Sequence, residues 1–393
     1  MKVEVPGFVA GAVAAGLKKN KRKDVGVIFS SVPACAAGVF TTNQVQAAPV
    51  VLDKERITSG YAQAVVVNSG NANACTGARG IEDAKAMARA AASALGIGEE
   101  LVLVASTGVI GQPLNLTAIE EALPKLSGQL KPDGLFDVAQ AIMTTDTFPK
   151  AVSKQAHVGE KPFTVAAVAK GAGMIRPDMA TMLCFVCTDV GATPEALAKS
   201  LTRAVARSFN TITVDGDMST NDTVLVLANG LSGLQLEETQ CAEAFQDTLN
   251  ELLLTLALQI VKDGEGATKL VRVKVEGAPS EEEAKKVAYT VAESPLVKTA
   301  LFGEDANWGR IVAAIGRAGV SLDPDTIQIY FDGMQMVKDG QGCGQEAEAA
   351  AKRVFRHNRF SITIHLGLGS EGATVHTCDL STDYVKINAD YRT

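Results

Sequence analysis

The sequence predicts a protein of the α/β (α+β) class, with sheets layered against helices and a smaller α+β domain at the end of the chain. Two observations predict the layers: short apolar runs recur through the first two thirds, and Ala-rich helical segments separate them. A third predicts the second domain, because a new helix follows the Gly-rich stretch 262–269 and strand-like segments then finish the chain. We therefore expect domains at 1–277 and 278–393.

Six apolar runs are the expected strands of the first domain. Each is apolar enough to be covered on at least one face, which indicates a buried sheet. They are 25–30, 62–67, 101–105, 163–169, 183–188 and 223–228. The earlier segment 8–17 has the length of a signal-peptide core, but Glu4 precedes it and a basic run follows it, which reverses a signal's charge order. We expect it to be part of the folded chain.

Helices of the first domain are marked by their ends. The segment 82–95 should stop at Gly96, since glycine readily adopts the left-handed conformation that ends a helix. A second helix should begin where Thr193 can cap the N-terminus and Pro194 occupies the first helical position. The longest should run from about 241 to 262.

The second domain is predicted to begin with a helix capped by Ser280. The segment 327–337 reads as a hairpin with Asp332 and Gly333 at its turn. Three further segments are expected as strands: 361–366, 374–380 and 383–388.

Composition narrows the class of partner. With 393 residues, 47% of them hydrophobic, the chain can bury a large core. Its formal charge of -7 arises without a long acidic or basic block, which argues against nucleic acid or a membrane surface and favours a small molecule. Seven scattered cysteines do not form a disulfide framework and indicate the cytoplasm. No apolar stretch reaches the length that spans a bilayer.

Three patterns that could indicate a dinucleotide or metal site are not supported by the residues around them. The G-x-G-x-x-G at 367–372 is followed by a strand-like segment, so no helix N-terminus would hold a pyrophosphate. Cys184 and Cys187 lie in an apolar strand on which residues three apart face opposite sides, and no second pair completes a zinc site. The four histidines are dispersed. We expect no metal and no bound cofactor.

Four polar loops are the stronger signal for a site. Glycines and hydroxyl side chains just past strand ends expose backbone N–H groups and allow close approach to a ligand. Any one of these loops would pass for an ordinary turn, but four together indicate a site at the edge of a sheet. They are 68–77, 106–111, 143–150 and 214–222.

Thr181 is the candidate nucleophile, at the end of a Gly- and Pro-containing stretch that leads into a strand. A threonine hydroxyl needs a base, and no histidine is close in sequence. Cleavage before Thr181 would free an α-amine, whose ordinary pKa of about 7.7 to 8.0 suits a base. The alternative is a packing threonine, since threonine is common where a strand begins.

Seven segments carry a resemblance to the ornithine acetyltransferase family of the cyclic arginine pathway, and the match covers almost the whole chain. The resemblance implies an αββα sandwich similar to N-terminal nucleophile hydrolases, with a smaller C-terminal domain. It also implies a precursor that cleaves itself between Ala180 and Thr181 into fragments 1–180 and 181–393, assembled as an α2β2 heterotetramer. The segments are "NSGNANACTG", "ASTGVIG", "IMTTDTFPK", "GMIRPDMATML", "VDGDMSTND", "EDANWGRI" and "VKINADYRT".

The resemblance also implies the chemistry. The acetyl group would pass from N-acetyl-L-ornithine to Thr181 and then to L-glutamate, with Thr107 and Gly108 as the oxyanion hole. Acetyl-CoA is left open as a second donor. The final residues of the chain are expected to return to the active site. The implied substrate-binding residues are Thr147, Lys170, Thr181, Glu265, Asn388 and Thr393.

Two other functions remain compatible with these residues. In a self-processing aminopeptidase or amidohydrolase, water would resolve the acyl-enzyme instead of an amine. In a small-molecule-binding protein, the chain would stay uncut and Thr181 would only pack. Glutamate dependence separates the first alternative from acetyl transfer, and the mass of the denatured chain separates the second.

Overall fold

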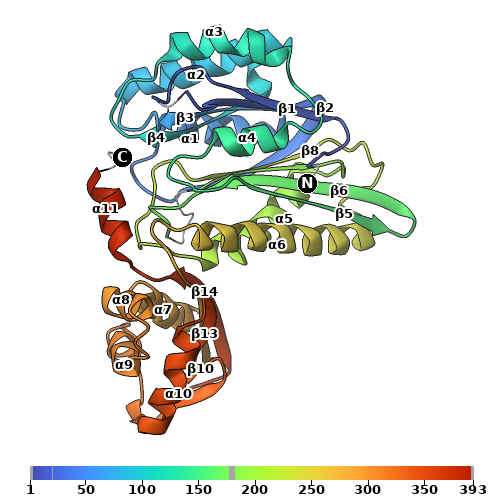
Figure 1. The fold of residues 1–393 in the computed structure, drawn as a ribbon. Coiled ribbons are helices and arrows are strands. Elements are labelled where there is room, and N and C mark those ends of the chain that lie inside the picture. The colour runs from blue at the N-terminus through green and yellow to red at the C-terminus, as the bar shows by residue number, and fades with distance from the viewer. Residues whose placement is uncertain (1–2, 20, 177–181, 391–393) are drawn as a thin grey trace.

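The protein consists of two sheets with their helices, arranged one after the other along the chain (Figure 1). The computed structural model describes residues 3–19, 21–176 and 182–390. The first sheet has eight strands and the second has six. The predicted mixture of sheets and helices is confirmed.

The strands of the first sheet follow the order β4-β3-β2-β8-β7-β6-β5, with β1 paired to β2. All six apolar runs form strands. The segment after Pro6, which we expected only to be part of the folded chain, forms β1, and β5 was not anticipated. The strands are β1 (Phe8–Val13), β2 (Val25–Phe40), β3 (Tyr61–Asn71), β4 (Val102–Val109), β5 (Lys150–Val158), β6 (Lys161–Lys170), β7 (Leu183–Thr188) and β8 (Thr223–Ala228).

Strand β2 belongs to both halves of this sheet. Its residues 25–29, 34 and 35 pair with β3, and its residues 35–40 pair with β8. The β2–β3 register shifts between Phe29 and Ala34, where the strand passes from one half to the other. Both β layers are therefore one continuous hydrogen-bonded sheet.

The two halves of the sheet pack face to face. Ile28, Val65 and Leu103 of one half share a buried cluster with Val168 and Phe185 of the other. Helices α1 (Ala48–Arg56), α2 (Gly77–Leu95) and α3 (Leu116–Ser127) cover one outer face, and α5 (Pro194–Ala206) and α6 (Thr239–Lys262) cover the other. The layer order is αββα, as expected, with the short α4 (Leu135–Ala141) contributing to the inner cluster.

The helix ends and buried cysteines that the sequence predicts are found in the structure. Gly96 has φ 72° and ends α2, while the Thr193 side chain accepts a hydrogen bond from the Ala196 amide at the start of α5. Cys184 and Cys187 lie in the cores on opposite faces of β7. Burial raises the pKa of both thiols, so they act as small buried side chains.

The second sheet has the order β12-β11-β10-β13-β9-β14, and one face packs against helices α7 to α10. It begins with β9, inside the segment that we assigned to the first domain, because β9 pairs with both β13 and β14. Asp332 and Gly333 have positive φ and form the turn of the expected hairpin. Its elements are β9 (Leu270–Ala278), α7 (Glu281–Ala292), α8 (Pro295–Phe302), α9 (Trp308–Gly316), β10 (Gln328–Phe331), β11 (Met334–Lys338), β12 (Gln341–Gly342), α10 (Gln345–Phe355), β13 (Arg359–His365) and β14 (Glu371–Cys378).

The expected strand at 383–388 is wrong: this segment is helical and lies in α11 (Thr382–Asp390). The Ser381 hydroxyl accepts hydrogen bonds from the amides of Asp383 and Tyr384, which caps the first turn. This cap outweighs the strand propensity of the alternating apolar residues that follow. Figure 1 shows α11 leaving the second sheet and running toward the first.

Candidate active site

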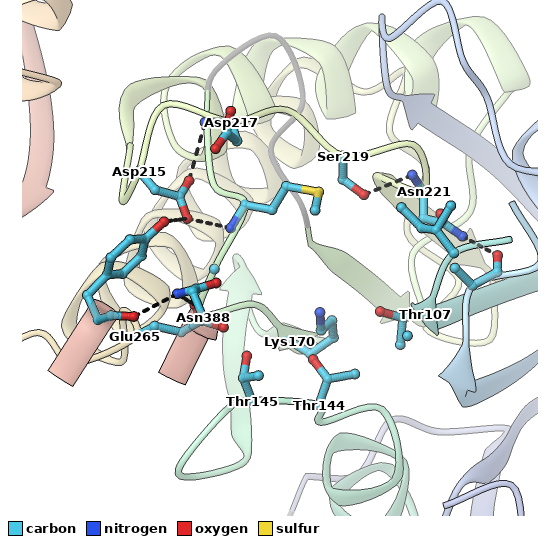
Figure 2. Close-up of a pocket in the computed structure, with 16 residues that line it drawn as sticks. Thr107, Thr144, Thr145, Lys170, Asp215, Asp217, Ser219, Asn221, Glu265 and Asn388 are labelled. Carbon is cyan, nitrogen blue, oxygen red and sulfur yellow. Dashed lines mark hydrogen bonds between the residues drawn. The ribbon is translucent and has the colours of Figure 1, made fainter. Parts of the chain in front are cut away.

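The four polar loops of the sequence meet around one cavity of about 230 Å³ (Figure 2). Each loop contributes to the wall: Ala72 from the first, Thr107 and its neighbours from the second, Thr144 and Thr145 from the third, and Asp215 to Asn221 from the fourth. The lining residues are Ala72, Thr107, Gly108, Ile110, Thr144, Thr145, Lys170, Gly173, Met174, Asp215, Asp217, Ser219, Asn221, Glu265, Tyr384 and Asn388.

Several of these side chains were not predicted individually. Asp215, Asp217, Ser219 and Asn221 lie in a loop that the sequence had singled out, but nothing in that loop showed which side chains face inward. Tyr384 was missed because its segment was read as a strand.

Thr107 and Gly108 stand at the end of β4, beside the parallel strand β3. Gly108 has φ 135°, and a Cβ built on it would lie 2.4 Å from the carbonyl carbon of Gly70 and 2.5 Å from the nitrogen of Asn71. Only glycine fits this close approach of two backbones. The chain is therefore held at the cavity wall in one conformation.

Asn221 lines the cavity and ties three of the loops together. Its Nδ2 donates to the carbonyl oxygen of Ala72 at 2.7 Å and to that of Ser106 at 2.9 Å. Ala72 belongs to the cavity wall, and Ser106 directly precedes the wall residue Thr107. The side-chain amide of Asn221 therefore fixes the wall around Thr107. The bonds are buried, so breaking them would leave unsatisfied carbonyl groups.

Lys170 ends β6 and is 3% exposed at the cavity floor. Burial lowers the pKa of its ammonium group, and the nearby Asp146 carboxylate counteracts that effect. Burial alone would raise the pKa of Asp146, but Lys170 and Lys150 together hold it below its ordinary value. Asp146 accepts hydrogen bonds from Lys150 Nζ and from the Gly171 amide, both at 2.7 Å. A buried lysine side chain therefore lies in the floor beside a carboxylate.

Thr147 lies behind the wall and faces a neighbouring cavity lined by Lys18, Arg22 and Lys23. Its hydroxyl and its amide both donate to the Asp263 carboxylate. Thr144 and Thr145 of the same loop line the cavity of Figure 2, whereas Thr147 does not.

The side of the cavity opposite Thr107 carries carboxylates and is covered by α11 (Figure 2). Asn388 Nδ2 donates to Glu265 Oε2 at 2.8 Å, and the Tyr384 hydroxyl donates to Asp215 Oδ2 at 3.5 Å. Burial raises the pKa of Asp215 to about 6. Burial, and then the Asp215 and Glu265 carboxylates, raise the pKa of the Tyr384 hydroxyl.

Ala180, Thr181 and Thr393 lie outside the described residues. Met182, which follows Thr181 in the chain, donates its amide to Asp222 Oδ1 at 2.9 Å. Asp222 is fully buried, and burial raises the pKa of its carboxyl group well above the ordinary value. Three of the six expected substrate contacts (Lys170, Glu265 and Asn388) line the cavity together with Thr107 and Gly108.

Other kinds of site find no support in the described residues. Within them, no three His, Cys, Asp or Glu side chains are grouped to hold a metal ion. The glycines at 367–372 join β13 to β14, so no helix follows them. Across the same residues, no helix combines the length and apolarity that crossing a membrane requires.

An αββα fold with a polar, mixed-charge cavity between its loops is typical of an enzyme that acts on small charged molecules. Residues 9–393 match the ArgJ family. The chain is 54% identical to the arginine biosynthesis bifunctional protein ArgJ of Syntrophotalea carbinolica and 53% identical to that of Geobacter sulfurreducens, over 100% of each chain.

The chain therefore belongs to the ArgJ family, and it is an acyltransferase that moves an acetyl group in arginine biosynthesis. Among solved structures it is 38% identical to an ornithine acetyltransferase from Mycobacterium tuberculosis that is complexed with ornithine. That match covers 45% of this chain and 96% of the other, with a TM-score of 0.40.

Proposed function

We propose that the protein transfers the acetyl group of N-acetyl-L-ornithine to L-glutamate through an acetyl ester of Thr181. One observation carries the proposal: a single cavity holds Lys170 on its floor and Glu265 on its opposite side, with Thr107 and Gly108 on the wall. Such a cavity suits two amino acids that share an α-carboxylate and differ in side-chain charge. A solved relative at 38% identity is complexed with ornithine.

The reaction begins with the enzyme's own chain. Cleavage of the Ala180–Thr181 bond frees the α-amine of Thr181, which takes the hydroxyl proton as the oxygen attacks the acetyl carbonyl. Thr107 and Gly108 stabilise the resulting oxyanion, a contribution of about 3 to 4 kcal/mol per donor. The C–N bond then breaks, and ornithine leaves with the proton. The α-amine of glutamate attacks the ester and regenerates Thr181.

The two fragments stay together after the cut in this proposal. Strand β6 precedes the cut and β7 follows it, and the two are paired through residues 165–170 and 183–188. Strand β8 of the second fragment likewise pairs with β2 of the first. The proposal includes an α2β2 assembly in the cytoplasm, where the seven free cysteines would remain reduced.

The test compares wild-type protein with Thr181→Ala. We expect wild type to separate into fragments 1–180 and 181–393 under denaturing conditions, and to release more than one ornithine per active site from N-acetylornithine only when glutamate is present. Thr181→Ala should remain one inactive chain, whereas Thr58→Ala, at an exposed position, should behave as wild type. Continued release beyond one ornithine per active site without glutamate would favour a hydrolase. The same assay with acetyl-CoA in place of N-acetylornithine tests the second donor.

A further inference from the structure

The cavity is unevenly charged. The carboxylates of Asp215, Asp217 and Glu265 line the part under α11, and the ammonium group of Lys170 lies near Thr107 and Thr144 (Figure 2). We call these parts the acidic half and the lysine half. The described lining residues therefore bring three carboxylates and one ammonium group to a single cavity.

Asp215, in the acidic half, is held by several hydrogen bonds. Its carboxylate accepts hydrogen bonds from the amides of Met174 at 2.6 Å and Ile175 at 2.8 Å, and from the Tyr384 hydroxyl at 3.5 Å. These donors fix the carboxylate at the cavity wall.

The titratable groups that face Asp215 come from three directions. Asp217 lies on the same loop, Tyr384 on α11, and the buried Cys378 thiol on β14. Tyr384 is also influenced by Glu265. Burial raises the pKa of Asp215, the amides of Met174, Asp217 and Ile175 partly counteract that rise, and the Asp217 carboxylate adds to it.

The two proposed substrates carry side chains of opposite charge, so they require different charge states of the acidic half. Ornithine and glutamate share their α-carboxylate, and this constant negative charge suits the lysine half. Their side chains then extend into the acidic half, and the fourth side-chain position is an ammonium in one and a carboxylate in the other. Three fixed negative charges would attract the ammonium and repel the carboxylate.

We propose that Asp215 lets one cavity accept both substrates by exchanging a proton, an inference that rests on the proposed function. Ionised Asp215 faces the ornithine ammonium. Protonated Asp215 donates a hydrogen bond to the glutamate side-chain carboxylate. Each proton comes from solvent when the glutamate side chain binds, and it returns to solvent when the ornithine side chain binds, so no other reactant is required. The raised pKa of Asp215, about 6, keeps both forms accessible near neutral pH.

The test compares two acetyl donors, N-acetylornithine and N-acetylglutamate, on self-processed wild-type enzyme. The quantity measured is the second-order rate constant for acetylation of fragment 181–393, followed by mass spectrometry between pH 5.5 and 8. Neither donor's side chain titrates in this range, since the ordinary pKa values are about 4.3 for Glu and 10.4 for a Lys-type amine. The ratio of the two constants cancels the titration of Thr181 and of any group that both donors share.

We expect the ratio of N-acetylornithine to N-acetylglutamate constants to rise about tenfold per pH unit. Asp215→Asn should flatten the ratio, because Asn imitates the protonated form and still accepts one backbone hydrogen bond. Asp215→Glu should restore the slope. Asp217→Asn removes the same charge from the same loop and should preserve the slope, although its rates can change.

Two results would overturn the inference while acetyl transfer stands: a wild-type ratio that is constant with pH, or a slope that survives in Asp215→Asn. The wild-type series needs no variant, so it decides the question even if Asp215→Asn fails to fold. Acetylation by neither donor would instead overturn the proposed function, and the inference with it.

Discussion

Lys150 Nζ lies 2.5 Å from Asp263 Oδ2, and both side chains are buried. Lys150 begins β5, and Asp263 follows the last turn of α6, so this ion pair joins the loop at 143–150 to the end of the longest helix. Glu265 follows two residues later. The pair therefore positions a cavity carboxylate, although neither of its members lines the cavity.

Lys150→Met should lower the free energy of unfolding by about 3 to 5 kcal/mol, because it leaves Asp146 and Asp263 as buried charges without their ammonium partner. Urea denaturation measures the loss. Lys154→Met is the matched control: its ion pair with Glu251 is exposed and should be worth about 1 kcal/mol or less. Equal losses in the two variants would contradict the role of the buried pair.

Gly108→Ala should reduce kcat by about 10²-fold or more, since a methyl group would collide with the backbone of Gly70 and displace the oxyanion wall. The acetyl-transfer assay measures it. Gly111→Ala serves as the control because Gly111 also has positive φ, at 80°, but a Cβ there meets nothing within 4 Å. Comparable loss of activity in both variants would mean that backbone strain, and not the collision, is responsible.

His376→Gln should make the protein more resistant to acid. Burial, and then the charges of Arg272 and Arg359, lower the pKa of His376 to about 4 from its ordinary 6.5. Between pH 6.5 and 4, His376 therefore binds a proton in the unfolded chain but not in the folded chain. The free energy of unfolding falls as the pH falls through that window. The cost attributable to His376 is about 2 kcal/mol at pH 5.

The measurement for His376 is the free energy of unfolding between pH 4 and 8. The variant should lose less stability than wild type on acidification, and the two curves should run parallel above pH 7. His357→Gln, on an exposed histidine, should keep the wild-type profile. An unchanged profile in His376→Gln would show that another group causes the acid sensitivity.

Periodicity in the sequence was sufficient to predict most of the first sheet, because its strands are buried on both faces and read as continuous apolar runs. β7 and β8 begin and end where the sequence placed them. β5 was missed because its outer residues are polar and partly exposed, which hides the pattern. That β2 serves both layers depends on pairing with strands far along the chain, and no local pattern reports such pairing.

The site was predictable as a set of loops, and less so as individual side chains. Clusters of glycine and hydroxyl residues identified four loops, and each of them contributes residues to the cavity wall. Which side chains point inward depends on tertiary contacts: Thr147 turns away because Asp263, more than a hundred residues later, accepts its hydrogen bonds. Tyr384 reaches the cavity only because Ser381 caps a helix in a segment with strand-like composition.

Asn388→Ala tests whether α11 closes the cavity. Three hydrogen bonds hold α11 and the residue before it against loops beside the cavity: Asn388 to Glu265 at 2.8 Å, Tyr384 to Asp215 at 3.5 Å, and the Ser381 hydroxyl to the Gly266 carbonyl at 2.6 Å. Removing the first should weaken closure by about 1 kcal/mol, or roughly fivefold. An acetyl ester waiting for glutamate is protected only while water is kept away from it.

The expected result is therefore a fivefold rise in the ratio of ester hydrolysis to acetyl transfer, measured as the excess of ornithine released over N-acetylglutamate formed, divided by the N-acetylglutamate formed. Self-cleavage should proceed as in wild type, because it requires only the groups around Ala180 and Thr181. Lys386→Ala, on the exposed side of the same helix, should leave the ratio unchanged. If Asn388→Ala also leaves it unchanged, then Asn388 does not hold α11 over the ester, and water must be excluded by the cavity wall alone.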